Sequence, residues 1–245
     1  MKNTLMIVTV AGFAAGAMAD GNVIAYTSFE NAFVGDRYVD TGDASVDHDL
    51  INNAGQSVVD FTDDGIEIGF DSQYFNTRNS VGLTDGDFVG ATDYTGTVGS
   101  FTDGVQGFQL QDADGMMRTS FDTITAPGGR TLFEWNLMMD FYVQETGWES
   151  DDYMRIWVVV DGGVEIDILN TAGMDIDDMG IEGEWHMATV NLTGYASATL
   201  HVELDSNSGS ESLYLDNIVF KTGVPTPGTF ALLGLGGLAA TRRRR

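Results

Sequence analysis

The chain has 245 residues, no cysteine, and 37 acidic against 11 basic residues, which gives a formal net charge of −26 at pH 7. Without cysteine, no disulfide can hold the fold. So strong a negative charge also excludes binding to nucleic acid or to an anionic membrane surface through the general electric field.

The N-terminal residues have the organisation of a secretory signal peptide. Lys2 supplies the positive charge, residues 5–15 form a short apolar core, and Ala17-Met18-Ala19 is a cleavage site of the small-x-small type. Removal of residues 1–19 by signal peptidase would leave Asp20 as the new N-terminus. A core helix or strand is the structural alternative for this segment.

Residues 20–222 hold all 37 acids and only six bases, so this body carries a charge of about 6 − 37 = −31. Such a charge attracts divalent cations. Adaptation to a saline habitat, or solubility alone, explains it equally well. The acidic turns at residues 40–49, 112–115 and 175–178 lack the register of an EF-hand loop, so we expect solvated turns there.

The sequence pattern of the body predicts strands and turns, because its apolar residues do not recur at helical spacing. Strand-like runs bounded by Gly, Asp, Asn and Ser occupy residues 23–29, 57–61, 66–70, 108–111, 131–143, 153–161, 164–169, 185–192, 199–205 and 213–221. We therefore predict an all-β fold of one domain, a two-sheet antiparallel β-sandwich of the jelly-roll type. An N-terminal signal helix and a short C-terminal hydrophobic helix are expected to flank it.

Two long strands supply the predicted ligand-binding face. Apolar side chains alternate along residues 131–143 and 153–161, so Phe133 to Val143 and Met154 to Val160 face the core. If the two strands are neighbours, their opposite faces join aromatic and polar groups into one surface: Glu134, Asn136, Asp140, Tyr142, Tyr153, Arg155 and Trp157. Aromatic faces stack on sugar rings while polar groups bind hydroxyls, which favours polysaccharide binding. The alternatives are that loops cover this face, or that Arg155 only pairs with Glu134 or Asp140.

Residues 164–170 raise the alternative of a secreted glycan-active enzyme. Glu165-Ile166-Asp167-Ile168 resembles the active strand of laminarinase-type glycoside hydrolases, which are also β-sandwiches. The resemblance implies a nucleophile at Glu165 and an assisting carboxylate at Asp167. The acid/base position, however, holds Leu169 or Asn170, and a retaining enzyme needs two carboxyls about 5–5.5 Å apart. The two carboxylates equally suit the polar face of an edge strand.

Other catalytic sites find little support in the sequence. A polysaccharide lyase needs a basic residue and a cationic neutraliser, and the body holds a single lysine. His48, His186 and His201 are scattered, so they favour neither a zinc site nor a Ser/His/Asp triad. His186 and His201 could meet on adjacent strands, but satisfied structural histidines are expected.

The closing strands carry a further resemblance. Residues 183–186, 190–195, 200–205 and 213–218, which end on Leu215-Asp216-Asn217-Ile218, resemble the closing half of galactose-binding-like and carbohydrate-binding-module jelly rolls. Their partner would be the first strand, residues 25–30. In a sandwich the first and last strands commonly lie side by side, which would bring Glu30 and Asp216 together.

Two carboxylates at one location repel each other unless a cation lies between them. Ca²⁺ suits an all-oxygen site, so we predict a structural calcium ion at Glu30 and Asp216, with Asp205 and Asn207 as further ligands. The alternative is that loop amides satisfy both carboxylates.

The C-terminal tail predicts where in the cell the protein is delivered. Pro225 and Pro227 precede a 12-residue apolar run at residues 229–240, and Arg242, Arg243, Arg244 and Arg245 close the chain. A helix of this length reaches about 18 Å, short of a membrane span of about 30 Å. Residues 223–245 resemble the PEP-CTERM sorting signal, here with Thr226 in place of the motif's Glu.

That resemblance implies processing by an exosortase after transient contact with the inner membrane. It also implies delivery to the cell surface or extracellular matrix of a Gram-negative-type bacterium. The sequence therefore predicts an exported, non-catalytic β-sandwich that holds a structural calcium ion and either binds polysaccharide or builds matrix. A secreted glycan-active enzyme is the alternative.

Overall fold

A computed structural model describes residues 21–31, 37–128, 134–145 and 147–223. The predicted signal helix, the C-terminal helix and the sorting tail lie outside these residues, as do Phe133 and the start of the strand predicted at 131–143. In the described part the elements are strands and two short 3₁₀ turns, so the all-β prediction is confirmed. No helix in that part of the chain is long and apolar enough to cross a membrane.

The strands are β1 (Val23–Thr27), β2 (His48–Asp49), β3 (Phe70–Phe75), β4 (Gly90–Thr92), β5 (Gly107–Gln111), β6 (Gly115–Phe121), β7 (Ile124–Thr125), β8 (Trp135–Val143), β9 (Tyr153–Val160), β10 (Val164–Asn170), β11 (Trp185–Asn191), β12 (Ser197–Ser206) and β13 (Ser212–Thr222). The 3₁₀ turns are η1 (Gly82–Thr84) and η2 (Asp177–Met179).

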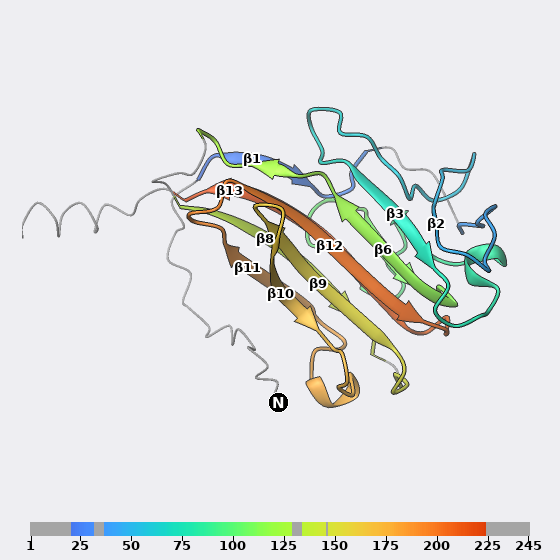
Figure 1. The fold of residues 1–245 in the computed structure, drawn as a ribbon. Coiled ribbons are helices and arrows are strands. Elements are labelled where there is room, and N and C mark those ends of the chain that lie inside the picture. Colours follow the sequence, from blue (N-terminus) through green and yellow to red (C-terminus); the bar gives the residue numbers. More distant parts are fainter. Residues whose placement is uncertain (1–20, 32–36, 129–133, 146, 224–245) are drawn as a thin grey trace, which may run out of the picture.

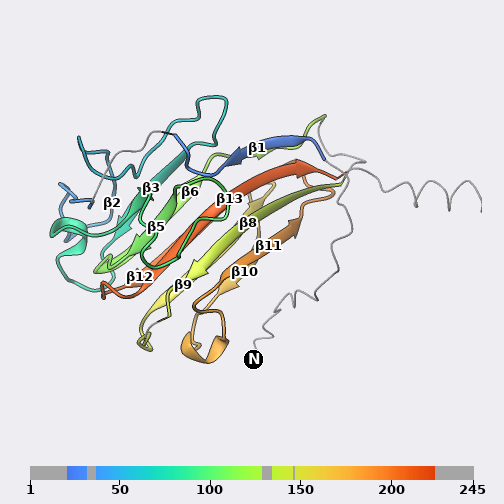
Figure 2. The ribbon, with the colours of Figure 1, turned by 180° about the vertical axis from the view of Figure 1, so that it is seen from behind.

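The strands form two antiparallel sheets packed as a β-sandwich. The six-stranded sheet has the order β11-β8-β13-β5-β4, with β1 also paired to β13. The seven-stranded sheet has the order β10-β9-β12-β6-β3-β2, with β7 also paired to β12. Figure 1 looks onto the seven-stranded sheet and Figure 2 onto the six-stranded one. Consecutive strands repeatedly cross between the sheets, for example from β8 to β9 and from β12 to β13.

The core lies between the sheets and follows the predicted alternation. Trp135, Leu137, Met139 and Val143 of β8 are at most 1% exposed, and Met154 to Val160 on alternate positions of β9 are fully buried. Burying a large apolar side chain contributes roughly 1.5–3 kcal/mol, so these two strands alone supply a substantial part of the stability. The core faces of both strands are as predicted.

The sequence prediction missed β6 and misplaced β3. In β6 (Gly115–Phe121) the side chains of Met117, Thr119 and Phe121 face the core, and those of Met116, Arg118 and Ser120 face outward. The sequence does not show this alternation clearly, because the inward set includes a polar Thr and the outward set includes an apolar Met. The run predicted at 66–70 instead ends where β3 begins, at Phe70. Both strands lie inside the seven-stranded sheet, so the sequence prediction did not include the outward side chains of β6 and β3 in any candidate site.

The two ends of the described body meet. β1 pairs antiparallel with β13, which confirms that the first and last strands lie side by side. Beyond them, Asn22 N donates to Thr222 Oγ1 at 3.1 Å, and Thr222 N donates to Asn22 O at 2.9 Å. A side chain at Gly21 would collide with the carbonyl of Thr222, so only glycine allows this close approach. Residues 21 and 223 therefore leave the sandwich at one end.

Candidate functional site

The two halves of the predicted ligand-binding face lie on opposite sides of the sandwich. β8 belongs to the six-stranded sheet and β9 to the seven-stranded sheet, so the assumption that these strands are neighbours is wrong. Their core faces meet across the interior, and their outward faces point apart. Glu134, Asn136, Asp140 and Tyr142 are therefore separated from Tyr153, Arg155 and Trp157 by the core.

The outer face of the seven-stranded sheet carries a strip of alternating arginine and aromatic side chains. Trp157 of β9 stacks on His201 of β12, with ring centroids 5.0 Å apart and an interplanar angle of 22°. The guanidinium carbons of Arg155 and Arg118 lie 4.5 Å and 5.7 Å from the Trp157 ring centroid. Arg118 also lies 4.7 Å from the ring centroid of Phe75. We call these five side chains the arginine–aromatic strip.

The strip is fixed by strand register. Trp157 is paired with His201, and Glu203 is paired with both Arg155 and Arg118 on its two sides. The Arg118 Nε donates to Glu203 Oε1 at 2.6 Å. Because each guanidinium contacts a ring and a carboxylate, Trp157 is only 5% exposed while its neighbours remain half-exposed. The side chains of the strip are therefore held by ring stacking and by hydrogen bonds between charged groups.

Two pKa values on this face are perturbed. Burial, with the nearby Arg118 charge, lowers the pKa of His201, so this imidazole is neutral at pH 7. Its Nδ1 lies 2.9 Å from Ser120 Oγ. Burial and the neighbouring Glu203 raise the pKa of Tyr153 to about 12, which keeps its hydroxyl protonated. Both groups are therefore hydrogen-bonding groups rather than charges at neutral pH.

The segment that resembles a glycosidase strand borders the strip on the edge strand β10. Arg155 donates from Nε to Asp167 Oδ1 and from Nη2 to Glu165 Oε2, both at 2.7 Å. At the expected acid/base position, Leu169 is buried and Asn170 donates its amide to Asp167. This arrangement agrees with the alternative in which both carboxylates form the polar face of an edge strand.

Residues 93–106, which we call the cover loop, lie over part of the outer face of the six-stranded sheet (Figure 2). Val98 and Phe101 of this loop pack on Tyr142, Tyr214 and Trp185 as a small second core. Trp185 Nε1 donates to Ser100 O at 2.9 Å. Tyr142 is thus buried under the cover loop. For this residue the structure agrees with the sequence-based alternative that loops cover the predicted face.

The other residues of that half lie along β8 and next to it. Asp140 is buried and accepts a hydrogen bond from Asn217 Nδ2 at 2.9 Å. Asn136 is half-buried between Lys221 and Asn191 in the register, and Glu134 is exposed just before the strand.

Glu30 and Asp216 are brought to the same region, where both hold the cover loop. Asp216 Oδ2 accepts hydrogen bonds from Thr102 N, Thr102 Oγ1 and Asp103 N at 2.6–3.0 Å, and its Oδ1 accepts from Asn217 N at 2.7 Å. Glu30 Oε1 accepts from the amides of Val105 and Gln106, both at 2.7 Å. Burial raises the pKa of Asp216 to about 6.

This donor set does not fit a shared calcium ion at Glu30 and Asp216. The oxygens Asp216 Oδ1, Asp216 Oδ2 and Glu30 Oε1 already accept six hydrogen bonds from N–H and O–H groups, and donors at those positions would repel a cation. The geometry corresponds to the alternative in which loop amides satisfy the two carboxylates.

Asp205 and Asn207 lie apart from that pair, at the end of β12. Arg78 donates from Nε to Asp205 Oδ1 at 2.5 Å and from Nη2 to Asp152 Oδ1 at 2.8 Å. The amide of Asn207 donates to Glu211 Oε2 at 3.3 Å. The four predicted calcium ligands therefore fall into two separate groups.

The three histidines do not meet. His186 is on β11 and His201 on β12, in different sheets, and His48 Nε2 lies 2.6 Å from Asp40 Oδ2. Each imidazole ring has its own hydrogen-bonding partner. His186 Nε2 lies 2.9 Å from Ile181 O, and His201 Nδ1 lies 2.9 Å from Ser120 Oγ. They are satisfied structural histidines, as the sequence led us to expect.

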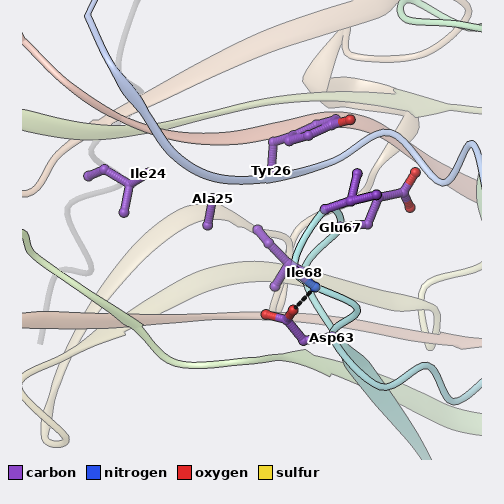
Figure 3. Close-up of a pocket in the computed structure, with 8 residues that line it drawn as sticks. Ile24, Ala25, Tyr26, Asp63, Glu67 and Ile68 are labelled. Carbon is purple, nitrogen blue, oxygen red and sulfur yellow. Dashed lines mark hydrogen bonds between the residues drawn. The ribbon is translucent and has the colours of Figure 1, made fainter.

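A small hollow lies beside β1, between Ile24–Tyr26 and residues 63–68 (Figure 3). Its volume is about 170 Å³, below the roughly 300–1,000 Å³ of ligand pockets. The Glu67 carboxylate points away from Asp63 and accepts hydrogen bonds from Thr27 Oγ1 and Glu30 N. This hollow is a gap beside an edge strand rather than a ligand site.

No protein-family model matches the sequence, and no curated protein matches it. Among solved structures, the chain is similar to a "Family 16 Carbohydrate Binding Module-2", with a TM-score of 0.34 and 15% identity over 55% of this chain and 85% of that one. It is also similar to the xylan-binding module CBM15, with a TM-score of 0.33 and 13% identity over 72% and 95% of the two chains. A Stig cyclase, Fisc from Fischerella sp. TAU, gives a TM-score of 0.38 and 11% identity over 83% and 98%. At these identities and TM-scores the likenesses carry no argument about binding or catalysis, and the β-sandwich rests on the strands themselves.

Proposed function

We propose that this protein is an exported, surface- or matrix-targeted β-sandwich of the jelly-roll type that binds polysaccharide without cleaving it. The observation that carries the proposal is the arginine–aromatic strip on the outer face of the seven-stranded sheet. The strip offers ring edges and faces of Phe75 and His201 beside guanidinium N–H groups and carboxylate oxygens. This combination matches a sugar, whose C–H face is apolar and whose rim consists of hydroxyls.

Two features favour this face over the opposite one. No segment of the described residues crosses it in Figure 1, whereas the cover loop lies over the aromatic residues of the six-stranded sheet. Its side chains are also preorganised by salt bridges and stacking, so little rotamer entropy remains to be lost on binding. The binding residues of the proposal are therefore Phe75, Arg118, Tyr153, Arg155, Trp157 and His201.

Replacing Trp157 by Ala is expected to weaken polysaccharide retention at least tenfold, which corresponds to about 1.4 kcal/mol. The loss of the indole removes the ring on which Arg118 and Arg155 both pack, so each guanidinium group loses one of the contacts that orient it. Affinity electrophoresis on a panel of neutral and acidic polysaccharides measures the effect, with Arg118→Ala as the second variant.

Trp185→Ala is the matched control, since it removes an indole from the opposite face of the sandwich. Retention lost with Trp185→Ala but kept with Trp157→Ala would move the site to the six-stranded sheet. A reducing-sugar assay on the same panel tests the enzyme alternative. Release of reducing ends that disappears in Glu165→Gln would replace the binding proposal by a hydrolase.

The second part of the proposal concerns the export and final localisation of the protein. Residues 21 and 223 leave the sandwich side by side, which is compatible with a signal peptide and a sorting tail that both connect to one end of the body. A body held through this end presents both outer faces to its surroundings. We therefore propose that signal peptidase cleaves after Ala19 and that an exosortase acts near Pro225 and Pro227.

Replacing Arg242–Arg245 by Ser is expected to leave most of the protein unprocessed in the inner-membrane fraction, because the cationic stop that orients the tail is lost. Cell fractionation with mass spectrometry of both termini measures this, and the mature protein should begin at Asp20. Thr226→Glu, which restores Pro-Glu-Pro, is the control and should be processed at least as well as the wild type. Equal processing of the arginine-free variant would contradict the sorting role.

A further inference from the structure

Three carboxylates converge where the β8–β9 loop meets the turn between β12 and β13. One carboxylate oxygen each from Glu149, Asp152 and Glu211 lies within 4.8 Å of the others. Glu211 is 1% exposed and Asp152 is 5% exposed, whereas Glu149 reaches solvent. Ligands at 2.3–2.6 Å from one Ca²⁺ lie at most about 5 Å apart, so the spacing suits a single ion.

A buried hydroxyl without a partner points to the same place. Ser206 is fully buried, and its Oγ has no hydrogen-bond partner among the described residues. On β12 it continues the inward row of Val202 and Leu204, and Leu204 pairs with Met154 of β9. Continued by one residue, the register makes Ser206 and Asp152 inward neighbours on adjacent strands, which places the unpartnered hydroxyl beside the carboxylate cluster.

The protein satisfies these carboxylates only in part: Asp152 Oδ2 accepts a hydrogen bond from Glu149 N at 2.6 Å, and Glu211 Oε2 accepts one from Asn207 N at 3.3 Å. An oxygen that accepts one hydrogen bond keeps a second lone pair for a cation, whereas Asp216 Oδ2 accepts three. Arg78 contacts Asp152 but is shared with Asp205 and with Asp151, at 2.5 Å and 3.0 Å. Carboxylate oxygens within 4.8 Å of one another repel each other unless a proton or a cation lies between them. A divalent cation would remove this repulsion and, beside Ser206, would give the Oγ a partner.

We propose that Glu149, Asp152 and Glu211, with Ser206 Oγ, form a calcium site that ties the β8–β9 loop to the β12–β13 turn. The hard, all-oxygen donor set favours Ca²⁺ over transition metals. The site lies at the end of the sandwich opposite residues 21 and 223, because β13 begins there at Ser212 and ends at Thr222. It is separate from the arginine–aromatic strip and does not depend on polysaccharide binding.

Terbium luminescence of the purified full chain tests the site, since Trp148 directly precedes Glu149 and can sensitise a bound Tb³⁺. We expect saturable luminescence, displaced by Ca²⁺, and a melting midpoint that rises by several degrees in Ca²⁺ relative to EDTA. Glu211→Gln should weaken Tb³⁺ and Ca²⁺ at least tenfold. It keeps the size and hydrogen bonds of a protonated carboxyl, so its fold in EDTA should be retained.

Two further variants make the result decisive. Asp178→Asn removes an equal charge from an exposed position of η2 and should bind both ions like the wild type. Trp148→Phe should abolish the luminescence while calorimetry still detects Ca²⁺ binding. The proposal is overturned if the wild type shows no saturable binding, if Glu211→Gln binds unchanged, or if Trp148→Phe keeps its luminescence.

Discussion

The melting temperature is expected to fall as the pH rises from 5 to 8.5, the reverse of ordinary acid denaturation. Burial and the charges of Asp85, Asp112 and Asp114 raise the pKa of Asp87 to about 8. Burial raises that of Asp216 to about 6. Asp87 is 6% exposed, and its Oδ2 has no hydrogen-bond partner in the described part of the chain.

The sign follows from the direction of these shifts. A carboxyl whose folded pKa lies above its unfolded value of about 4 binds its proton more tightly in the native state. Its contribution to stability is complete below pH 4 and is lost as the pH rises, through 6 for Asp216 and through 8 for Asp87. One pKa unit corresponds to about 1.4 kcal/mol, so Asp87 alone can remove several kcal/mol of a typical 5–15 kcal/mol.

Asp87→Asn should therefore raise the melting temperature at pH 8.5 by several degrees and change it little at pH 5. Calorimetry at both values, in EDTA, measures the difference. Asp178→Asn is the control, since it relieves the general repulsion of the acidic body by the same charge from an exposed position. If both variants respond equally to pH, net charge rather than the buried Asp87 governs the effect.

Asp216→Ala should release the cover loop and destabilise the protein by about 2–4 kcal/mol. The Asp216 side chain is fully buried and accepts four hydrogen bonds, three of them from Thr102 and Asp103. Leaving buried donors without an acceptor costs about 1–3 kcal/mol each, less where water can reach them once the loop opens. Val98 and Phe101 would then leave Tyr142, Tyr214 and Trp185 exposed.

Hydrogen exchange of residues 98–106, together with the fluorescence of Trp185, distinguishes loop release from general destabilisation. The amides of the cover loop should exchange faster by at least two orders of magnitude, while those of β9 and β12 keep their order of protection. Asp103→Ala removes an exposed side chain from the same loop but keeps its backbone N–H, so it should behave like the wild type. Unchanged loop protection in Asp216→Ala would contradict the anchoring role.

The sequence predicted the strands with strong alternation, and it assigned their core faces correctly. Period-two patterns are local, so β8, β9, β12 and β13 could be read from the chain alone. The sequence prediction missed β6 because Thr119 and Ser120 are both polar, so apolar and polar residues do not alternate there. Arg118 of β6, a central member of the arginine–aromatic strip, was therefore not among the predicted site residues. An isolated arginine between Met117 and Thr119 carries no signal until neighbouring strands place Phe75 and Trp157 beside it.

The assignment of each strand to one of the two sheets determines which outward side chains can form a common site. Tyr142 and Trp157 each lie on an outward face, as predicted, but the chain crosses the sandwich between β8 and β9. Pairing between strands distant in sequence depends on backbone hydrogen bonds and on how core side chains interdigitate, and neither leaves a local pattern.

By itself, the sequence determined an acidic, disulfide-free, all-β body between two segments typical of export and sorting, because charge, cysteine content and alternation are sums over single residues. Only the tertiary structure decided that Glu30 and Asp216 anchor a loop, that Trp157 stands between two arginines, and that Glu149, Asp152 and Glu211 converge. Each of these depends on side chains far apart in the chain, whose burial and partners exist only once the two sheets have packed.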